Sequence, residues 1–421
     1  MAVFRFPRCP MLARSWRLTV TLVAALCSAA STIANDWPQF LGPQRNAISS
    51  EQGLLDVLPN AGPRVLWQKE VGSGFSGPVV AGEFLILFHR VGDKEIIACL
   101  EPATGKERWQ FSYPTQYPLD IARDDGPRST PLITDHRVYT LGAEGRFLCL
   151  ELETGKRIWE RLLLNDYRVP ESYFGVGTSP LLIGDRLLVN VGGKEAGIVA
   201  FAKDTGQELW KATDHEASYS SPVAATLAGH HRAVFFTREG VVLLDPKTGE
   251  VQYSKHWRAR IHASVNAATP VVVDDDIFIS ACYSTGALLL HAAGASIEEV
   301  WKSNDVMSNH YNTCIHDKGF LYGFDGRQEE GPHLRCVEMR TGKVRWTCDR
   351  AGCGSMILAD RKLIILGENG DLVLAEVNPD AYKEKARASV LTGPCRSPVA
   401  LANGLFYGRD GKRLVCWTLK K

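Results

Sequence analysis

Five side chains that could recognise a ligand stand at the starts of short β-rich runs that recur along the chain: Arg128, Tyr219, Asn266, Tyr311 and Arg396. Guanidinium, phenol and amide groups bind anions and hydroxyls, but they supply neither a carboxylate ligand for a hard cation nor a general base. No Asp or Glu occupies the equivalent positions. Asp124 and Asp125 precede Gly126-Pro127, a context typical of solvated turn residues. We therefore expect a binding site with no catalytic residue and no bound metal.

Three connections between the recurring runs are longer than the rest, at residues 110–128, 160–177 and 254–267. They carry aromatic and basic side chains, among them Tyr173, Phe174, Trp257 and Arg258. Loops longer than a fold requires often hold binding residues, and Tyr, Trp and Arg dominate protein interfaces. These connections are therefore predicted to add to the binding surface.

Other kinds of site are disfavoured by the sequence. It contains no Gly-x-Ser-x-Gly, no phosphate-binding P-loop and no His-Glu-x-x-His. His256 and His262 lack zinc-ligand spacing. With 48 basic and 47 acidic residues, the chain also lacks the excess positive charge that nucleic-acid binding requires.

An internal repeat must position these residues. A segment such as Thr104-Gly-Lys-Glu-Arg-Trp109 recurs and ends on an aromatic residue, and its copies are separated by 42 to 51 residues. That period fits four short strands with their turns. The aromatic residues are Trp67, Trp109, Trp159, Trp210, Tyr253, Trp301 and Trp346. We expect these rings to pack against the neighbouring repeat, because a ligand would need one ring and not a series of them.

The repeats predict an all-β, eight-bladed β-propeller with four-stranded antiparallel blades. Each repeat before the last contains β-rich runs such as 129–133, 137–141 and 146–150, followed by the Thr-Gly hairpin. The eighth repeat ends after its third strand, near Leu414–Thr418. An isolated strand at Arg64–Val71 is predicted to supply the fourth and to close the ring.

The N-terminal 34 residues are predicted to be a signal peptide. Four arginines precede an apolar run from Leu18 to Ala30, and Thr32-Ile33-Ala34 resembles a cleavage site. We expect residues 35–63 to form a lead-in segment and residues 64–421 the propeller. No later stretch has 18 uninterrupted apolar residues, so the mature chain is expected to have no transmembrane segment and to be an exported, monomeric protein of the periplasm or cell envelope.

Nine cysteines remain after the predicted cleavage. Cys99, Cys149 and Cys336 occupy the same place in different repeats, too far apart for a bridge, and are expected to be small buried residues. Cys348 and Cys353 flank a short connection and are close enough to pair, but the sequence leaves their state open.

At the level of these motifs, the chain resembles the pyrroloquinoline-quinone (PQQ) type β-propeller repeat of quinoprotein alcohol dehydrogenases and of BamB-like assembly factors. The resemblance rests on the strand-Thr-Gly-x-x-x-Trp unit and on the opening Asp36-Trp-Pro-Gln-Phe-Leu-Gly-Pro43, and it covers residues 36–421. For the dehydrogenases of this family, the resemblance implies PQQ and Ca²⁺ in the central funnel, a catalytic Asp and often a disulfide between adjacent cysteines. This sequence has neither Cys-Cys nor the Cys-x-x-Cys-His of a covalent haem.

The sequence thus favours a non-catalytic scaffold that binds another envelope protein or a cell-envelope polymer through the loops at the funnel mouth, with no cofactor. Two alternatives stay open: a PQQ- and calcium-dependent alcohol or sugar dehydrogenase, and a BamB-like factor for outer-membrane protein assembly.

Overall fold

The computed structural model describes residues 1–3, 35–118, 124–170, 175–262, 264–294 and 296–421. One compact unit, Ala34–Lys421, contains all the secondary structure described below. The predicted signal peptide, residues 1–34, falls almost wholly outside the described residues. No helix in the described part of the chain is long and apolar enough to cross a membrane.

This unit is an eight-bladed β-propeller made of eight four-stranded antiparallel sheets, as predicted. Blade 1 contains β2 (Val79–Ala81), β3 (Phe84–Val91), β4 (Lys94–Leu100) and β5 (Glu107–Pro114), and blade 2 contains β6 (Leu132–Thr134), β7 (Arg137–Leu141), β8 (Arg146–Glu151) and β9 (Arg157–Leu162). Blade 3 contains β10 (Leu181–Ile183), β11 (Arg186–Gly193), β12 (Ala196–Ala202) and β13 (Glu208–Ala212). Blade 4 contains β14 (Val223–Leu227), β15 (His230–Phe236), β16 (Gly240–Leu244) and β17 (Val251–His256). Blade 5 contains β18 (Val271–Val273), β19 (Asp276–Ala281), β20 (Gly286–Ala293) and β21 (Ser296–Ser303). Blade 6 contains β22 (Ile315–Asp317), β23 (Phe320–Asp325), β24 (His333–Glu338) and β25 (Lys343–Cys348). Blade 7 contains β26 (Gly354–Ala359), β27 (Lys362–Gly367), β28 (Asp371–Glu376) and β29 (Glu384–Ser389). Short helices occur at α1 (Leu163–Asp166), η1 (Gln328–Glu330) and η2 (Asp349–Ala351).

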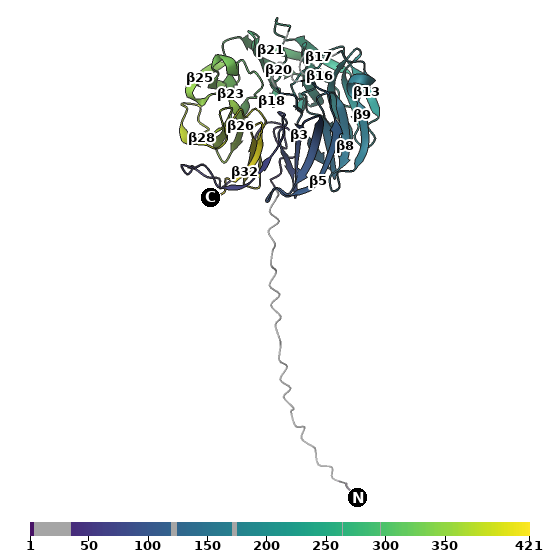
Figure 1. Ribbon diagram of the computed structural model, residues 1–421, viewed down its shortest axis with the longest axis vertical. Coiled ribbons are helices and arrows are strands. Elements are labelled where there is room, and N and C mark those ends of the chain that lie inside the picture. The colour runs from purple at the N-terminus through teal and green to yellow at the C-terminus, as the bar shows by residue number, and fades with distance from the viewer. Residues whose placement is uncertain (4–34, 119–123, 171–174, 263, 295) are drawn as a thin grey trace. The chain divides into compact units, whose positions relative to one another are not determined.

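Blade 8 joins the two ends of the propeller. It contains β30 (Ala400–Ala402), β31 (Leu405–Arg409), β32 (Arg413–Thr418) and, as its outer strand, β1 (Val65–Glu70). β1 pairs with β32 in antiparallel register, and backbone bonds from Thr418 N to Arg64 O and from Val71 N to Lys412 O extend the pairing at both ends. In Figure 1 the labelled strands follow one another around the unit in chain order and bring β32 back beside β3. The predicted closure by residues 64–71 is therefore confirmed.

The first strands are shorter than the sequence suggested. The run 129–133 was expected to be a strand, but β6 begins only at Leu132. The preceding Ser-Thr-Pro residues bond sideways to the neighbouring blades instead: Thr130 N donates to the Ser179 hydroxyl (3.0 Å), and Ser179 N donates to the Ser221 hydroxyl (3.0 Å). Pro131 has no N–H to contribute to a ladder. These residues therefore tie adjacent first strands together around the axis.

The hydrophobic core lies between neighbouring blades. Seven clusters of buried side chains fill the spaces between adjacent sheets, for example Val79, Ile86 and Phe88 of blade 1 against Val138 and Leu148 of blade 2. Residues on one face of each sheet contact the preceding blade and those on the other face contact the next. The second and third strands of each blade are therefore largely buried on both faces, as their nearly continuous apolar sequences suggest.

The repeat tryptophans dock on the following blade. Each of the six indoles donates its Nε1–H to a backbone carbonyl at the turn before the next blade's fourth strand, at 2.8–3.2 Å. The position of Gly105 shows why the repeat requires glycine after threonine. Its φ is +70°, and a Cβ at this position would lie 2.6 Å from the Trp67 ring. Only glycine accepts both the left-handed backbone and the close approach of the ring. Trp67 thus secures the closing blade against blade 1.

The lead-in segment packs across the ends of the first strands. Trp37 forms an antiparallel bridge with Val80 of β2, and Ile48 forms a parallel bridge with Leu358 of β26. Between them, the Arg45 guanidinium donates to the carbonyls of Pro180 and of Pro222 (2.7 Å for the latter). Arg45 is 4% exposed, and burial lowers its pKa to about 9. The segment thus connects blades 1, 3, 4 and 7 across the axis.

Candidate functional site

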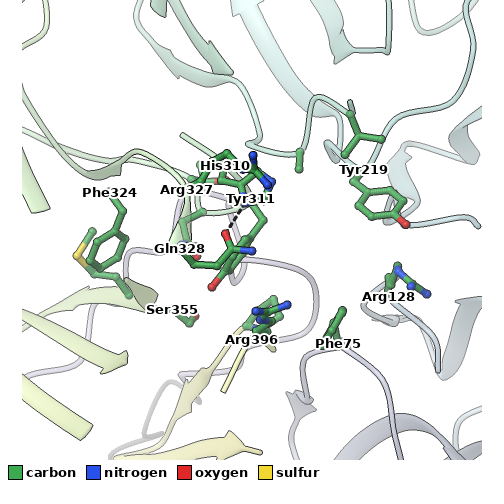
Figure 2. Close-up of a pocket in the computed structure, with 18 of the residues that line it drawn as sticks. Phe75, Arg128, Tyr219, His310, Tyr311, Phe324, Arg327, Gln328, Ser355 and Arg396 are labelled. Atoms are coloured by element: carbon green, nitrogen blue, oxygen red, sulfur yellow. Dashed lines mark hydrogen bonds between the residues drawn. The ribbon is translucent and has the colours of Figure 1, made fainter. Parts of the chain in front are cut away.

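A cavity of about 740 Å³ lies on the axis of the propeller. Eight connections lead from the fourth strand of one blade to the first strand of the next. Each connection, or the start of the first strand that follows it, contributes to the lining of the cavity. One residue from each is Phe75, Arg128, Gly177, Tyr219, Ile261, His310, Ser355 and Arg396. Figure 2 shows such side chains, from distant parts of the chain, surrounding one open space. The cavity is therefore a product of ring closure and belongs to no single blade.

Arg128 is held among aromatic rings at the cavity wall. Its Cζ lies 5.3 Å from the centroid of Tyr117 and 5.8 and 5.9 Å from those of Phe75 and Tyr219. The guanidinium also donates to the carbonyls of Gly126 (3.1 Å) and Asp124 (3.0 Å). A guanidinium stacked on rings is a cation with a fixed plane. Arg128 thus places a positive charge at a defined position in the cavity wall.

A second arginine enters from the opposite end of the sequence. Arg396 Nε lies 2.8 Å from Glu368 Oε1, and the Tyr311 hydroxyl donates to the same carboxylate. Burial, together with the nearby Cys353 and Glu368, raises the pKa of Tyr311 well above its ordinary value. Tyr311 therefore stays protonated and acts as a donor, and the group of three fixes the orientation of Arg396.

His310 occupies the neighbouring wall as part of a hydrogen-bonded chain. Its Nε2 lies 2.8 Å from the Tyr283 hydroxyl and its Nδ1 lies 2.5 Å from Gln328 Oε1. Burial lowers the pKa of His310. The imidazole is therefore neutral at pH 7. Beside it, Arg327 stacks on Tyr283 at 4.9 Å and pairs with Glu329 and Glu330, both at 3.5 Å.

Part of the cavity lining is apolar. Phe40 and Leu41 of the lead-in segment line it together with Phe324 of β23 and Met356 of β26. The bridges of Trp37 and Ile48 to β2 and β26 hold this part of the lead-in in place. The cavity lining therefore combines apolar side chains with cationic and aromatic ones.

Four of the nine binding residues predicted from the sequence line this cavity: Arg128, Tyr219, Tyr311 and Arg396. Asn266 does not, because it is buried and donates to the carbonyls of Thr237 (2.8 Å) and Trp257 (3.1 Å). Trp257 packs against the cluster between blades 4 and 5 and donates to Gly286 O (3.3 Å). Arg258 lies 3.7 Å from Glu239. Tyr173 and Phe174 lie outside the described residues.

The expectation of a solvated turn residue is wrong for Asp124, whereas the side chain of Asp125 is 32% exposed. Asp124 is 9% exposed and accepts hydrogen bonds from Gly74 N (3.0 Å) and Gly126 N (2.8 Å). Asp125 accepts from the Ser73 hydroxyl (2.5 Å). Both carboxylates bind the connection that enters blade 1 to the one that enters blade 2. The sequence Asp124-Asp125-Gly126-Pro127 resembles an exposed turn. In the fold, the connections that enter blades 1 and 2 meet near the axis, and these carboxylates bind one connection to the other.

The nine cysteines after residue 34 are buried free thiols. Cys348 and Cys353 are therefore unpaired in this structure. Cys353 lies near the cavity, with its Sγ 3.8 Å from the Tyr311 hydroxyl. Burial raises the pKa of the Cys353 thiol to about 12, which leaves it protonated.

Sequence reasoning missed the contribution of the hairpins between second and third strands. Tyr283, Arg327, Gln328 and Glu329 reach the cavity from two such hairpins, and Glu368 approaches it from a third. A length signal was present, because the hairpin between Asp325 and His333 is longer than its counterparts, such as 142–145. The lead-in residues Phe40 and Leu41 had no comparable signal.

The described residues do not form the calcium site that the dehydrogenase resemblance implies. Among them, no group of three or more His, Cys, Asp or Glu side chains is arranged to hold a metal ion. The carboxylates nearest the cavity wall are engaged otherwise, since Glu368 binds Arg396 and Tyr311 while Glu329 pairs with Arg327. This donor set does not fit a hard cation, which needs several oxygen ligands directed at one point.

Comparisons with known proteins agree with this architecture. The PQQ_2 family model, described as outer membrane protein assembly factor BamB, matches residues 92–348. Two curated relatives are a quinoprotein ethanol dehydrogenase of Pseudomonas putida, 29% identical over 143 residues, and the quinoprotein alcohol dehydrogenase PedH of the same species, 30% identical over 122 residues. These matches cover 32% and 28% of this chain but only 20% and 18% of the two enzymes.

Two solved structures share the fold. BamB from Moraxella catarrhalis superposes with a TM-score of 0.61 at 15% identity, over 85% of this chain and 98% of that one. The quinohemoprotein alcohol dehydrogenase of Comamonas testosteroni gives 0.65 at 13% identity, over 92% and 81%. At such identities the likeness concerns the fold alone. Because the family match spans more than half of its length, the chain belongs to the PQQ_2 family of BamB-like β-propellers.

Proposed function

We propose that this protein is an exported, non-catalytic β-propeller of the bacterial envelope that binds another envelope protein or an envelope polymer at its axial cavity. The observation that supports this most directly is the cavity itself, which is lined by arginines and aromatic rings from several blades together with apolar side chains. Arginine and aromatic residues are the usual anchors of recognition sites. Among the described residues, no group of three or more His, Cys, Asp or Glu side chains is arranged to hold a metal ion.

The test places a photo-crosslinking amino acid at Ile261, which lines the cavity and is 53% exposed. The matched control carries the same group at Ile158, which is 44% exposed on the outer strand β9 of blade 2. After export and irradiation in cells, we expect a discrete adduct from position 261 and none from position 158. Equal labelling at both positions, or labelling at neither, would contradict recognition at the cavity.

A BamB-like role in outer-membrane protein assembly is the second candidate, because the matching family model carries that description. It would make a component of the assembly machinery the captured partner. Identifying the adduct of position 261 by mass spectrometry distinguishes the two candidates: a subunit of a β-barrel insertion complex favours the assembly role, and any other envelope component favours the general scaffold.

A further inference from the structure

A second cavity, of about 550 Å³, lies beside the lead-in segment. It is lined by the first strands of blades 3 to 6 and by lead-in residues between Gln39 and Ile48. Apart from the shared Thr313, its lining residues in each of these blades follow in the chain those that line the axial cavity. The second cavity therefore lies farther along the first strands, away from the connections between blades.

At three other blades the lead-in segment pairs with the inner edge of the first strand, the edge opposite to the second strand. Val80 of blade 1 and Trp37 exchange two backbone hydrogen bonds of 2.8 Å. The amides of Ile133 in blade 2 and of Leu358 in blade 7 donate to lead-in carbonyls at 2.8 and 2.9 Å. Alternate residues of a strand direct their backbone groups to opposite edges, so the N–H and C=O at this position point to the inner edge. The lead-in thus shows that an extended chain can bind there.

In blades 3 to 6 the same position lacks such a partner. It is occupied by Leu182, Ala224, Val272 and His316, as the register with the second strands shows. Within the described part of the chain, no residue is hydrogen-bonded to their backbone groups on the inner edge. All four line the second cavity, and none of them is fully buried. A strand edge with unpaired donors and acceptors is a template for another extended chain.

The side chains of the lining indicate which kind of chain fits. Among the described lining residues none is acidic, and Arg45 is engaged by backbone carbonyls of blades 3 and 4 and by Gln39 Oε1. His316 Nε2 accepts the Gly319 N–H at 2.9 Å, and burial lowers the pKa of His316, so this side chain is neutral at pH 7. Much of the remaining lining is apolar, with Leu181, Val223 and Val271–Val273. The cavity therefore offers backbone hydrogen bonds and apolar contacts but no free charge.

From these features we infer that the second cavity binds an uncharged, largely apolar segment of a partner polypeptide in extended conformation, which pairs with the inner edges of blades 3 to 6 as the lead-in does in blades 1, 2 and 7. The inference concerns a second site and goes beyond the proposed function. Failure of recognition at the axial cavity would leave it standing, and the converse also holds.

The probe is a dansyl-labelled, amidated hexapeptide of alternating valine and threonine, whose binding to the exported protein is followed by fluorescence anisotropy. We expect binding at one site. The same peptide with every backbone amide N-methylated should bind about tenfold more weakly, because it keeps the side chains but cannot donate to the strand edges. Replacement of a central valine by aspartate should also weaken binding about tenfold, since the lining offers a carboxylate no free cation.

Variants of the protein locate the site. Ala224→Trp places an indole in the cavity and should weaken peptide binding about tenfold. Thr226→Trp is the matched control, because Thr226 is exposed on the same strand but outside the lining, and it should leave binding unchanged. Val272→Pro removes one inward N–H without a ladder bond and should weaken binding about threefold. Circular dichroism establishes folding, and Ala224→Trp decides the test if Val272→Pro does not fold.

Hydrogen exchange measured by mass spectrometry reports the pairing itself. Saturation with the peptide should slow exchange in the segments that contain Leu182, Val272 and His316 but not around Val80, whose amide is already paired. Absence of peptide binding, equal affinity for the N-methylated peptide, binding that survives Ala224→Trp, or unchanged exchange would overturn the inference. If the protein instead dimerises in sedimentation velocity and Ala224→Trp abolishes the dimer, the occupant is a second copy of this chain and the partner segment is refuted.

Discussion

The closing connection of the propeller should be sensitive to acid because of His89. This residue lies in β3 and is 7% exposed, and its Nδ1 accepts the backbone N–H of Gly72 at 3.0 Å. Gly72 belongs to the connection that leads from the closing strand β1 into blade 1. An imidazole can accept this hydrogen bond at Nδ1 only while it is neutral. Protonation of His89 would therefore break the contact that fixes the entry to blade 1.

The size of the effect follows from the two pKa values. Burial, with smaller contributions from the charges of Arg409 and Lys69, lowers the pKa of His89 from 6.5 to about 4. Between these values the unfolded chain binds the proton and the folded chain does not, so stability falls as the pH falls. At about 1.4 kcal/mol per pH unit, His89 should cost about 3 kcal/mol of unfolding free energy between pH 6.5 and pH 4.

The perturbation is His89→Gln, whose amide oxygen can accept the Gly72 N–H but does not titrate. Urea unfolding followed by tryptophan fluorescence, at several values between pH 7.5 and pH 4.5, gives the free energy of each protein. The variant should lie within about 1 kcal/mol of the wild type at pH 7.5 and gain about 2–3 kcal/mol relative to it by pH 4.5. Other groups titrate in both proteins, so the difference isolates His89. The exposed His230→Gln serves as control, and parallel pH profiles for wild type and His89→Gln would refute the reasoning.

Three further predictions concern packing. Gly105→Ala should destabilise the fold by about 1–3 kcal/mol more than Gly294→Ala in urea unfolding. Both glycines have positive φ, but of the two only Gly105 lies under an indole. Equal losses of stability would show that the Trp67 ring can move aside without loss of folding free energy. Arg45→Met should lower the free energy of unfolding by about 2 kcal/mol, because the carbonyls of Pro180 and Pro222 lose a charged donor. Gln44→Met, at an exposed position, is the control. An unchanged unfolding midpoint for Arg45→Met would contradict a stabilising role of Arg45. Trp257→Ala should cost about 2 kcal/mol by the same measurement, as it removes a half-buried ring and a bond to Gly286; an unchanged stability with impaired partner capture would instead make Trp257 a recognition residue.

The architecture could be predicted because its signals are local and repeated. Each Thr-Gly hairpin and its terminal aromatic residue occur within six residues, and their spacing reports the size of one blade. The missing fourth strand of the last repeat and the isolated strand at 64–71 left a single consistent way to close the ring. These features depend on strand periodicity and turn chemistry, which neighbouring residues determine.

The site could be predicted only in part. Arg128, Tyr219, Tyr311 and Arg396 were found because each lies two or three residues before the Pro of a first strand, or before the equivalent Cys314, where the connections approach the axis. Asn266 has a similar place in the sequence but does not line the cavity. Trp257 and Arg258 are in a long connection as well, yet they contact blade neighbours and Glu239 rather than the cavity. The direction of a side chain within a long loop depends on what the adjacent blades offer it.

The sequence by itself determined the number of blades and the docking rings, because both depend on patterns within about 50 residues. It also determined the pairing of the chain ends, because the last repeat lacks one strand and the segment 64–71 is the isolated strand that can supply it. Only the tertiary structure decided the content of the axis. Phe40, His310, Arg327 and Glu368 meet there across more than 300 residues of chain. Closure of the ring, and not any local preference, brings eight connections and the lead-in segment to one point.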